Sequence, residues 1–409
     1  MIEARTKAFW TNTIALSIGS LFVFANVYFT QPILPVLTKE FAVSPLQASM
    51  SLSLVIFAIG ISLFFYGPIS DSIGRRGIMI VTMGLGTIVT FLAAFSFNFE
   101  FFLVMRVLQG ILLAGLPSLA LAYIGEEYST HALSVAIGVF ISGNTIGGMF
   151  GRIVSGIVTD LYDWQTAFLV MGVVSLVCFV LFVVLLRPSR YFEPKKFDWK
   201  EALGVYKSHV LNRELRLAYI VGGLHFFLFV GHFNYVTYLL TSPPYQLPTS
   251  LIGVLFLTYI AGTISSQIAG RVSKKFSHAA CIKIGILIMV CGLAITLIPS
   301  VFAIIGGLLM NCFGFFFAHS TSSSWVSGRA TFSKASASGL YLISYYIGGS
   351  LGPIYLDPFW NQMNWPGVVI GCYLVLASTM YVAFQMASIE KEIDKQESSK
   401  RLQTSESRT

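Results

Sequence analysis

Long apolar runs alternate with short polar breaks along the whole chain. Each run is long enough to cross about 30 Å of hydrocarbon as an α-helix. The runs are continuous, whereas a transmembrane β-barrel would show weaker alternating segments of about 10 residues. The pattern therefore predicts an all-α integral membrane protein with twelve transmembrane helices. The predicted spans are 10–37, 46–69, 78–97, 100–123, 132–159, 164–186, 215–240, 249–270, 279–298, 300–323, 335–357 and 365–387.

One polar stretch divides these spans into six and six. We expect residues 1–186 to form an N-terminal six-helix bundle and residues 215–388 to form a C-terminal one. Residues 187–214 would be a cytoplasmic central linker. Residues 389–409 are polar and charged, so we expect a solvated, mobile cytoplasmic tail.

Glycines repeat between the fifth and the eleventh predicted spans. Each of four glycines in the first set recurs 201 positions later: Gly138, Gly147, Gly148 and Gly151 correspond to Gly339, Gly348, Gly349 and Gly352. Glycines at these spacings let a neighbouring helix backbone approach closely. The repeat predicts two pseudo-symmetric halves, a build typical of secondary transporters whose substrate site lies between the halves.

Composition agrees with a lipid environment. Charged residues make up 11% of the 409 residues and hydrophobic residues 55%, and the mean hydropathy is +0.76. A soluble domain carries about 25% charged residues, so a water-soluble protein is excluded. The five cysteines all fall in apolar runs, which gives no disulfide framework.

The basic residues predict the orientation. On a twelve-span path, 23 of the 26 lysines and arginines fall on one side, and the loops of the other side hold only Lys39. Basic residues are retained on the cytoplasmic side, so we expect both termini there, in a plasma or inner membrane. The net charge of +8 then reflects topology and anionic lipid and requires no nucleic-acid partner.

A glycine-rich loop with paired basic residues separates the second and third spans: Gly67-Pro-Ile-Ser-Asp71-Ser-Ile-Gly74-Arg75-Arg76-Gly77. It resembles the signature loop of the major facilitator superfamily. The resemblance implies a cytoplasmic gate, in which Glu126 and Glu127 could clamp Arg75 or Arg76. The alternative is that these charges only fix topology and solvate a loop. The predicted gate residues are Gly67, Asp71, Gly74, Arg75, Arg76, Glu126 and Glu127.

Two arginines lie inside predicted spans. Arg106-Val-Leu-Gln109-Gly110 matches an Arg-x-x-Gln-Gly element of the same superfamily, which implies a proton-coupling role for Arg106, Gln109 and Gly110. Arg106 and Arg152 each lie about 9 Å below the outer end of their spans. Both could hold an anion. Alternatively both could extend outward to headgroups or rim acids.

The fifth span resembles the antiporter motif of efflux members, with Asn144 where proline is expected. The first span, Tyr28-Phe-Thr-Gln31-Pro32, is similar to the sugar-efflux and drug:proton antiporter branch. Asparagine cannot kink a helix as proline does, which weakens the implied efflux activity. The predicted helix-packing glycines are Gly143, Gly147, Gly148, Gly151, Gly348, Gly349 and Gly352.

No carboxylate lies deep in a predicted span. Proton coupling would then use rim acids, the Arg106 network or histidine, whose ordinary pKa is about 6.5. His225 and His232 share a helix face as a coupling pair, or each is satisfied by neighbouring polar groups. The aromatic side chains line a pocket, or face lipid. The predicted substrate-cavity residues are Asn26, Tyr28, Arg152, His225, Phe229, His232, Asn234, Tyr341 and Tyr345. No metal site is expected.

These patterns predict a proton-coupled exporter of small amphipathic compounds, drug-like or sugar-like, working by alternating access. One alternative is a carrier for an organic anion held by Arg106 and Arg152, and another is a non-transporting membrane sensor. An enzyme is not expected, since no catalytic constellation stands out. No phosphate-binding loop occurs, so the proton gradient would supply the energy without a cofactor. The expected partners are a small-molecule substrate and the bilayer, with the chain as a monomer.

Overall fold

The computed structural model describes residues 1–194 and 199–406, and these residues form helices without a strand. Eleven helical segments among them are long and apolar enough to cross a membrane. In lipid each backbone polar group must find its partner within the protein, which a helix achieves within one segment. The predicted all-α membrane fold is confirmed.

Helices of the first half follow the predicted spans closely. α1 (Lys7–Tyr28) continues through the short helix η1 (Gln31–Ile33) into α2 (Leu34–Glu40), because Pro32 and Pro35 interrupt the hydrogen-bond ladder. The remaining elements are α3 (Pro45–Ile73), α4 (Arg75–Ala94), α5 (Phe99–Leu113), α6 (Gly115–Glu127), α7 (Thr130–Leu161) and α8 (Trp164–Leu185).

The second half begins with a helix inside the predicted linker, α9 (Trp199–Leu211). It continues with α10 (Arg213–Thr241), α11 (Thr249–Leu255), η2 (Phe256–Thr258), α12 (Tyr259–Val272), α13 (His278–Ile295), α14 (Val301–Arg329) and α15 (Lys334–Glu406).

α15 accounts for the difference between eleven spans and the twelve predicted. Its apolar segment of 60 residues, Lys334–Ile393, contains both predicted spans 335–357 and 365–387. Asn364 interrupts the helix with φ 51° and ψ −136°, a left-handed φ that asparagine tolerates better than most residues. Beyond this break the helix runs on to Glu406, through the predicted tail, because the sequence after Gly371 contains no glycine or proline to stop it.

Contacts divide the chain into two compact units. Unit 1 comprises Met1–Ala202, Phe229–Leu257 and Gly349–Val368, and unit 2 comprises Leu203–Leu228, Thr258–Gly348 and Val369–Thr409. Unit 1 thus contains the whole first half together with parts of α10, α11 and α15 from the second. The sites below are each described within one unit.

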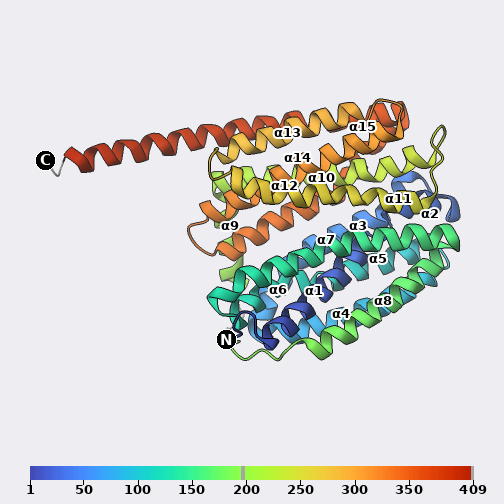
Figure 1. The fold of residues 1–409 in the computed structure, drawn as a ribbon, viewed down its shortest axis with the longest axis horizontal. Coiled ribbons are helices and arrows are strands. Elements are labelled where there is room, and N and C mark those ends of the chain that lie inside the picture. Colours follow the sequence, from blue (N-terminus) through green and yellow to red (C-terminus); the bar gives the residue numbers. More distant parts are fainter. Residues whose placement is uncertain (195–198, 407–409) are drawn as a thin grey trace. The chain divides into compact units, whose positions relative to one another are not determined.

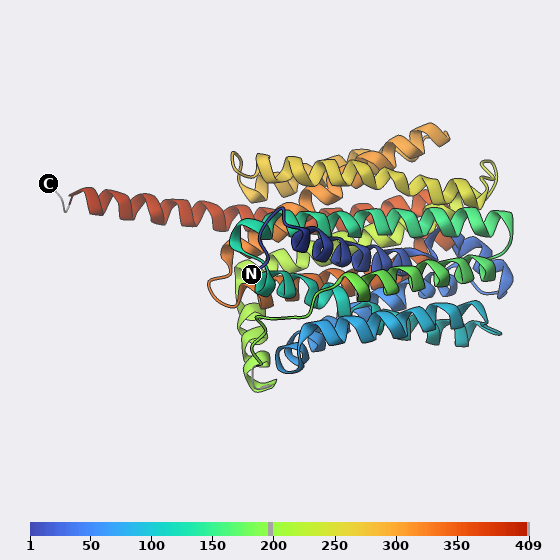
Figure 2. The ribbon, with the colours of Figure 1, turned by 60° about the horizontal axis from the view of Figure 1, so that its bottom comes forward.

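Glycines on α7 set the packing in unit 1. α1 runs beside α7 and α8 in both views (Figures 1 and 2). A Cβ atom built on Gly147 would lie 2.5 Å from the Leu21 carbonyl oxygen, and one on Gly143 would lie 2.5 Å from the Ser17 carbonyl oxygen. Only a residue without a side chain fits such backbone contact.

Unit 2 also has glycines that let helix backbones pack in direct contact. A Cβ atom on Gly348 of α15 would collide with the backbone of Gly223 on α10. α13 packs along α14 through Gly285 and Gly314, whose added Cβ atoms would meet each other's carbonyl oxygens at 2.7 and 2.5 Å. The first and fifth helices of each half are therefore joined by equivalent glycines.

Candidate functional site

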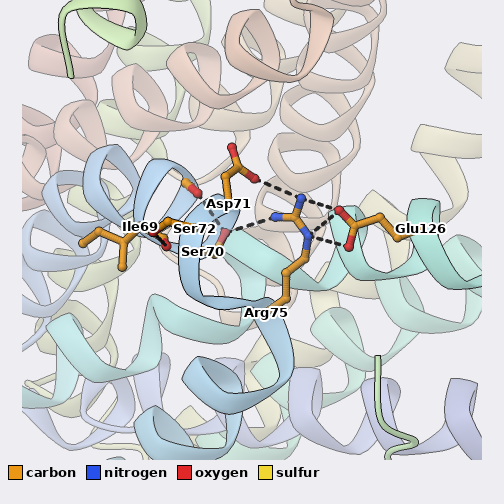
Figure 3. A network of polar contacts seen from close by, with 7 residues as sticks. Ile69, Ser70, Asp71, Ser72, Arg75 and Glu126 are labelled. Atoms are coloured by element: carbon orange, nitrogen blue, oxygen red, sulfur yellow. Dashed lines mark hydrogen bonds and ion pairs between the residues drawn. The ribbon is translucent and has the colours of Figure 1, made fainter. Parts of the chain in front are cut away.

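Arg75 organises a charged network at one end of unit 1 (Figure 3). Its guanidinium donates to Glu126 from Nε and Nη2, the shortest contact being 2.6 Å from Nη2 to Oε1. Nη2 also reaches Asp71 Oδ1 at 3.0 Å, and Nη1 donates to Ser70 Oγ at 3.0 Å. The side chain of Arg75 is 11% exposed and that of Asp71 is 46% exposed. Arg75 thus links the ends of α3, α4 and α6.

The local backbone explains why the loop places these groups together. Gly74 joins α3 to α4 with φ 95°, in the region that favours glycine. This sharp junction brings Arg75 back toward Asp71, which lies one turn earlier in sequence. A Cβ atom on Gly67 would meet nothing within 4 Å, so packing does not require a glycine there.

The two other charged gate candidates have different partners. Arg76 Nε donates to the carbonyl oxygen of Leu186 at 3.3 Å. Glu127 is 2% exposed and accepts the backbone N–H groups of Arg190 and Tyr191 at 2.7 and 3.0 Å. Glu126 holds Arg75, whereas Glu127 fastens the segment after α8.

Arg106 is fully buried inside unit 1 and its partners are neutral. It donates from Nε to the Ser51 carbonyl at 2.8 Å, and from its two terminal nitrogens to the carbonyls of Asn26 at 3.2 Å and Val27 at 2.9 Å. It also donates to the side-chain oxygen of Gln109. Hydrogen bonds to three helices disperse its charge without an acidic partner among the described residues.

The Arg106 network extends through neutral side chains. Gln109 Nε2 donates to Thr90 Oγ1 at 2.7 Å and to Asn26 Oδ1 at 3.1 Å. Asn26 Nδ2 donates to Ser175 Oγ at 2.9 Å. A Cβ atom on Gly110 would lie 2.6 Å from the Val55 carbonyl oxygen, so α5 lies directly on α3. The network joins α1, α4, α5 and α8.

Arg152 lies in a second polar cluster of unit 1. Its Nε and Nη2 donate to Gln31 Oε1 at 2.9 and 2.7 Å. The guanidinium carbon lies 4.1 Å from the ring centroid of Tyr28 and 4.4 Å from that of Phe256. Gln31 Nε2 in turn donates to Asn234 Oδ1 at 2.9 Å. We call these five residues the Arg152 latch.

The latch joins the two halves of the sequence. Tyr28, Gln31 and Arg152 belong to the first half, and Asn234 and Phe256 belong to the second. Two further hydrogen bonds do the same: Thr38 pairs with Tyr238 at 2.9 Å between the hydroxyl oxygens, and Ser250 Oγ donates to Asp160 Oδ2 at 2.7 Å. In each of these three connections, at most one of the hydrogen-bonding groups carries a charge.

An aromatic and histidine cluster lies in unit 2. His319 Nδ1 and Tyr341 Oη form a hydrogen bond of 2.9 Å. Phe226 stacks on Tyr345 with ring centroids 3.8 Å apart and an angle of 8° between the rings. His225 precedes Phe226 on α10 and is 1% exposed.

The sequence model of the Major Facilitator Superfamily matches residues 16–353. The chain belongs to this superfamily. Membership makes the protein a multi-pass membrane transporter for small molecules rather than an enzyme, as the sequence predicted.

Relatives within the superfamily match over nearly their whole length. The chain is 36% identical over 394 residues to the uncharacterized MFS-type transporter YybF of Bacillus subtilis (strain 168), covering 96% of this chain and 98% of YybF. It is 36% identical over 385 residues to the inner membrane transport protein YnfM of Escherichia coli (strain K12), covering 94% of this chain and 92% of YnfM.

A solved structure shares the superfamily fold. A bacterial homolog of the human lysosomal transporter Spinster, in an inward-facing and unoccupied conformation, aligns with a TM-score of 0.72 at 15% identity. The alignment covers 94% of this chain and 96% of that one. At this identity the likeness extends to the fold alone.

The structure corrects several expectations about this superfamily member. Arg106 and Arg152 are 0% and 1% exposed, so the alternative that they extend to headgroups or rim acids is wrong. Glu127 does not clamp Arg75 or Arg76, because backbone N–H groups occupy it. In contrast, one expectation holds: α7 runs unbroken past Asn144, as expected for asparagine in place of proline, and the side-chain oxygen of Asn144 accepts a hydrogen bond from Ser20.

The predicted cavity residues are distributed over both units. Asn26 belongs to the Arg106 network, and Tyr28, Arg152 and Asn234 belong to the latch. Three others, His225, Tyr341 and Tyr345, lie in unit 2. Phe229 and His232 pack with Phe233 on the part of α10 that belongs to unit 1.

The predicted packing glycines also differ among themselves. Gly151 lies against the Ala25 backbone, and Gly148 instead faces the side chains of Arg152 and Tyr28. Gly352 lies near Gly231 of α10, whose added Cβ atom would be 3.0 Å from the Gly352 carbonyl carbon. Gly349 is buried.

Sequence reasoning missed several residues that complete these sites. Gln31 is central to the latch, and its position directly before a proline that interrupts the first span was a usable signal. Thr90, Ser175 and Phe256 carry no such signal, because nothing in their sequence context sets them apart. No group of three or more His, Cys, Asp or Glu side chains that could hold a metal occurs in the described part of the chain.

Proposed function

We propose that the protein exports small amphipathic molecules in exchange for protons by alternating access, with the Arg75 end of unit 1 at the cytoplasmic side. The Arg152 latch is the observation that carries the proposal. It joins helices from both sequence halves by hydrogen bonds and ring contacts that can be broken and remade, and alternating access needs such a connection between its halves.

The strength of these hydrogen bonds suits a gate that opens and closes. A hydrogen bond contributes about 0.5–1.5 kcal/mol net, and one to a charged group about 1.5–3 kcal/mol. Three connections of this kind stabilise one state by a few kcal/mol, which is the usual gap between two populated conformations. The Arg75 network belongs to the predicted cytoplasmic side, where positively charged loops are retained, whereas Arg152 belongs to the predicted outer part of its span.

The alternative of an anion held by both arginines is less well supported. Arg106 donates to four neutral acceptors. Arg152 lies between two rings and donates twice to Gln31. An anion would have to displace these partners before binding either guanidinium.

A screen followed by a vesicle assay tests the proposal. Strains with and without the protein would be exposed to a panel of lipophilic drugs, sugars and organic acids, and compounds that show protection would be followed into everted membrane vesicles. We expect accumulation that a protonophore abolishes. Accumulation that is unchanged by the protonophore would refute proton coupling. A folded Asp71→Asn variant that protects the strain as well as the wild type does would argue against a gate at Asp71.

A further inference from the structure

His225 is a buried polar side chain without a hydrogen-bond partner in the part of the chain that the structure describes. It is 1% exposed, and neither ring nitrogen makes a hydrogen bond with any described residue. Buried polar groups in proteins are nearly always hydrogen-bonded, so an unsatisfied one calls for an explanation. A neutral imidazole has one N–H that donates and one bare nitrogen that accepts, so the bare nitrogen of His225 can take a proton and the N–H can bind an acceptor.

A second imidazole lies near the same part of α10. The ring centroid of His319 on α14 is 4.7 Å from that of Tyr345, which stacks on Phe226, the residue after His225. His319 uses Nδ1 for its hydrogen bond with Tyr341 Oη, which leaves Nε2 for another partner. Tyr341 lies directly on α10, because a Cβ atom on Gly222 would be 3.0 Å from its Oη. Three helices thus contribute to one polar cluster.

The surroundings supply no competing charge. The titratable neighbours are phenols: Tyr219 lies two turns before His225 on α10, and Tyr341, Tyr345 and Tyr346 come from α15. Neither imidazole forms an ion pair within the described residues. The ring of Phe315 lies parallel to that of His319, with centroids 6.0 Å apart. An imidazole is a far stronger base than a neutral phenol, so a proton taken up by this cluster binds an imidazole nitrogen.

We infer that His225 and His319 together form the proton-binding site of this transporter, with Tyr341 fixing the ring of His319. A proton taken up from water binds one ring nitrogen of the pair. The inference rests on the proposed proton coupling and names the side chains that carry the proton. It replaces the pair predicted from sequence, His225 with His232, because Tyr341 and Tyr345 connect His319 to Gly222 and Phe226, which lie before and after His225 on α10.

Nitrogen NMR of the histidine side chains tests the inference without a transport substrate. The full chain, labelled with ¹⁵N-histidine and held in lipid nanodiscs, contains six histidines. We expect two imidazoles to titrate together as the pH falls. His319→Gln should change the proton affinity of His225 about tenfold or more, and His225→Asn should do the same for His319, as coupled groups require.

Matched variants make the outcome decisive. His131→Asn changes an exposed histidine of α7 and should leave both coupled signals in place. Tyr341→Phe removes the phenol oxygen and should shift His319 more than His225. The inference is overturned if neither imidazole takes up a proton over the pH range in which the protein stays folded, or if each titrates unchanged when the other is replaced. Because protons are the only ligand in this experiment, its result does not depend on the vesicle assay.

Discussion

Arg152 donates two hydrogen bonds to one oxygen of Gln31, at 2.9 and 2.7 Å, while two aromatic rings cover the faces of its guanidinium. The amide nitrogen of the same glutamine passes the connection on to Asn234. One neutral side chain therefore holds a buried cation and joins the two halves of the sequence.

Replacing Gln31 by leucine should destabilise this state. The guanidinium loses both hydrogen bonds while it stays buried, which should cost about 2 kcal/mol or more in the free energy of unfolding. Arg152→Lys should also be costly, since an ammonium group cannot make the paired bonds or lie flat between two rings. Reversible unfolding in mixed micelles measures both.

Ser250→Ala serves as the control for the latch. It removes an exposed contact with Asp160 and should change the unfolding free energy by no more than about 0.5 kcal/mol. If Gln31→Leu and Ser250→Ala change the free energy of unfolding equally, the latch contributes no more stability than an exposed hydrogen bond.

The glycine repeat offers two matched comparisons. Gly147→Ala would force a methyl group to within about 2.5 Å of the Leu21 carbonyl oxygen, and Gly348→Ala would collide with the Gly223 backbone. Each should destabilise the protein by about 1–3 kcal/mol through overpacking. Gly138→Ala and Gly339→Ala meet nothing within 4 Å and should be neutral or slightly stabilising. Thermal unfolding of the four variants would show the contrast, and four equal changes would contradict it.

The Arg75 network should depend more on Glu126 than on Asp71. Glu126 accepts from two nitrogens of Arg75 and its side chain is 26% exposed, against a single contact and 46% exposure for Asp71. We expect Glu126→Gln to cost about 1–2 kcal/mol and Asp71→Asn about 0–1 kcal/mol, since exposed pairs are screened by water. Unfolding at low and high salt tests the order, and a larger loss for Asp71→Asn would reverse our assignment of the main partner.

Asp163 gives a prediction about pH. It caps α8 by accepting the Thr166 N–H at 2.6 Å, and this hydrogen bond lowers the pKa of the carboxyl. The stability from the ionised cap is therefore complete above the pKa of Asp163 in the unfolded chain and is lost as the pH falls through the lower folded pKa. Asp163→Asn keeps an acceptor but cannot ionise, so its melting temperature should fall less steeply in acid.

Asp163→Ala removes the acceptor and should cost about 1 kcal/mol near neutral pH. The measurement is a series of melting curves from neutral to acidic pH for the three proteins. Identical acid dependence in wild type and Asp163→Asn would rule out the cap as its source.

Much of the fold could be predicted from local pattern. The length of the apolar runs predicted the spans, because a helix must be long enough and apolar enough to cross the lipid. The repeated glycines predicted two related halves with close helix packing. The break at Asn364 was predicted only as a gap between two windows, because the left-handed backbone of one residue leaves no hydrophobic signature. The continuation of this helix through residues 389–406 was missed, since a polar composition does not distinguish a solvated helix from an irregular tail.

Contacts between residues that are close in sequence could be predicted, whereas contacts between distant residues could not. Asp71 and Arg75 are four residues apart, and their pairing follows from the loop. Gln31 and Asn234 lie 203 positions apart, and no periodicity connects them. The histidines show the same limit: spacing on one helix suggested pairing His225 with His232, whereas we infer a pair with His319, which lies 94 positions away on another helix.

The charge of Arg106 has a consequence for solutes. Neutral acceptors alone hold this guanidinium, so its field is dispersed but not cancelled. At an effective dielectric constant of about 20, a monovalent cation 10 Å away is repelled by about 2 kcal/mol, which lowers its local concentration more than tenfold. An anion at the same distance is favoured by as much. A solute that came within about 10 Å of Arg106 would therefore be favoured or disfavoured by the sign of its charge before it made any contact with the arginine.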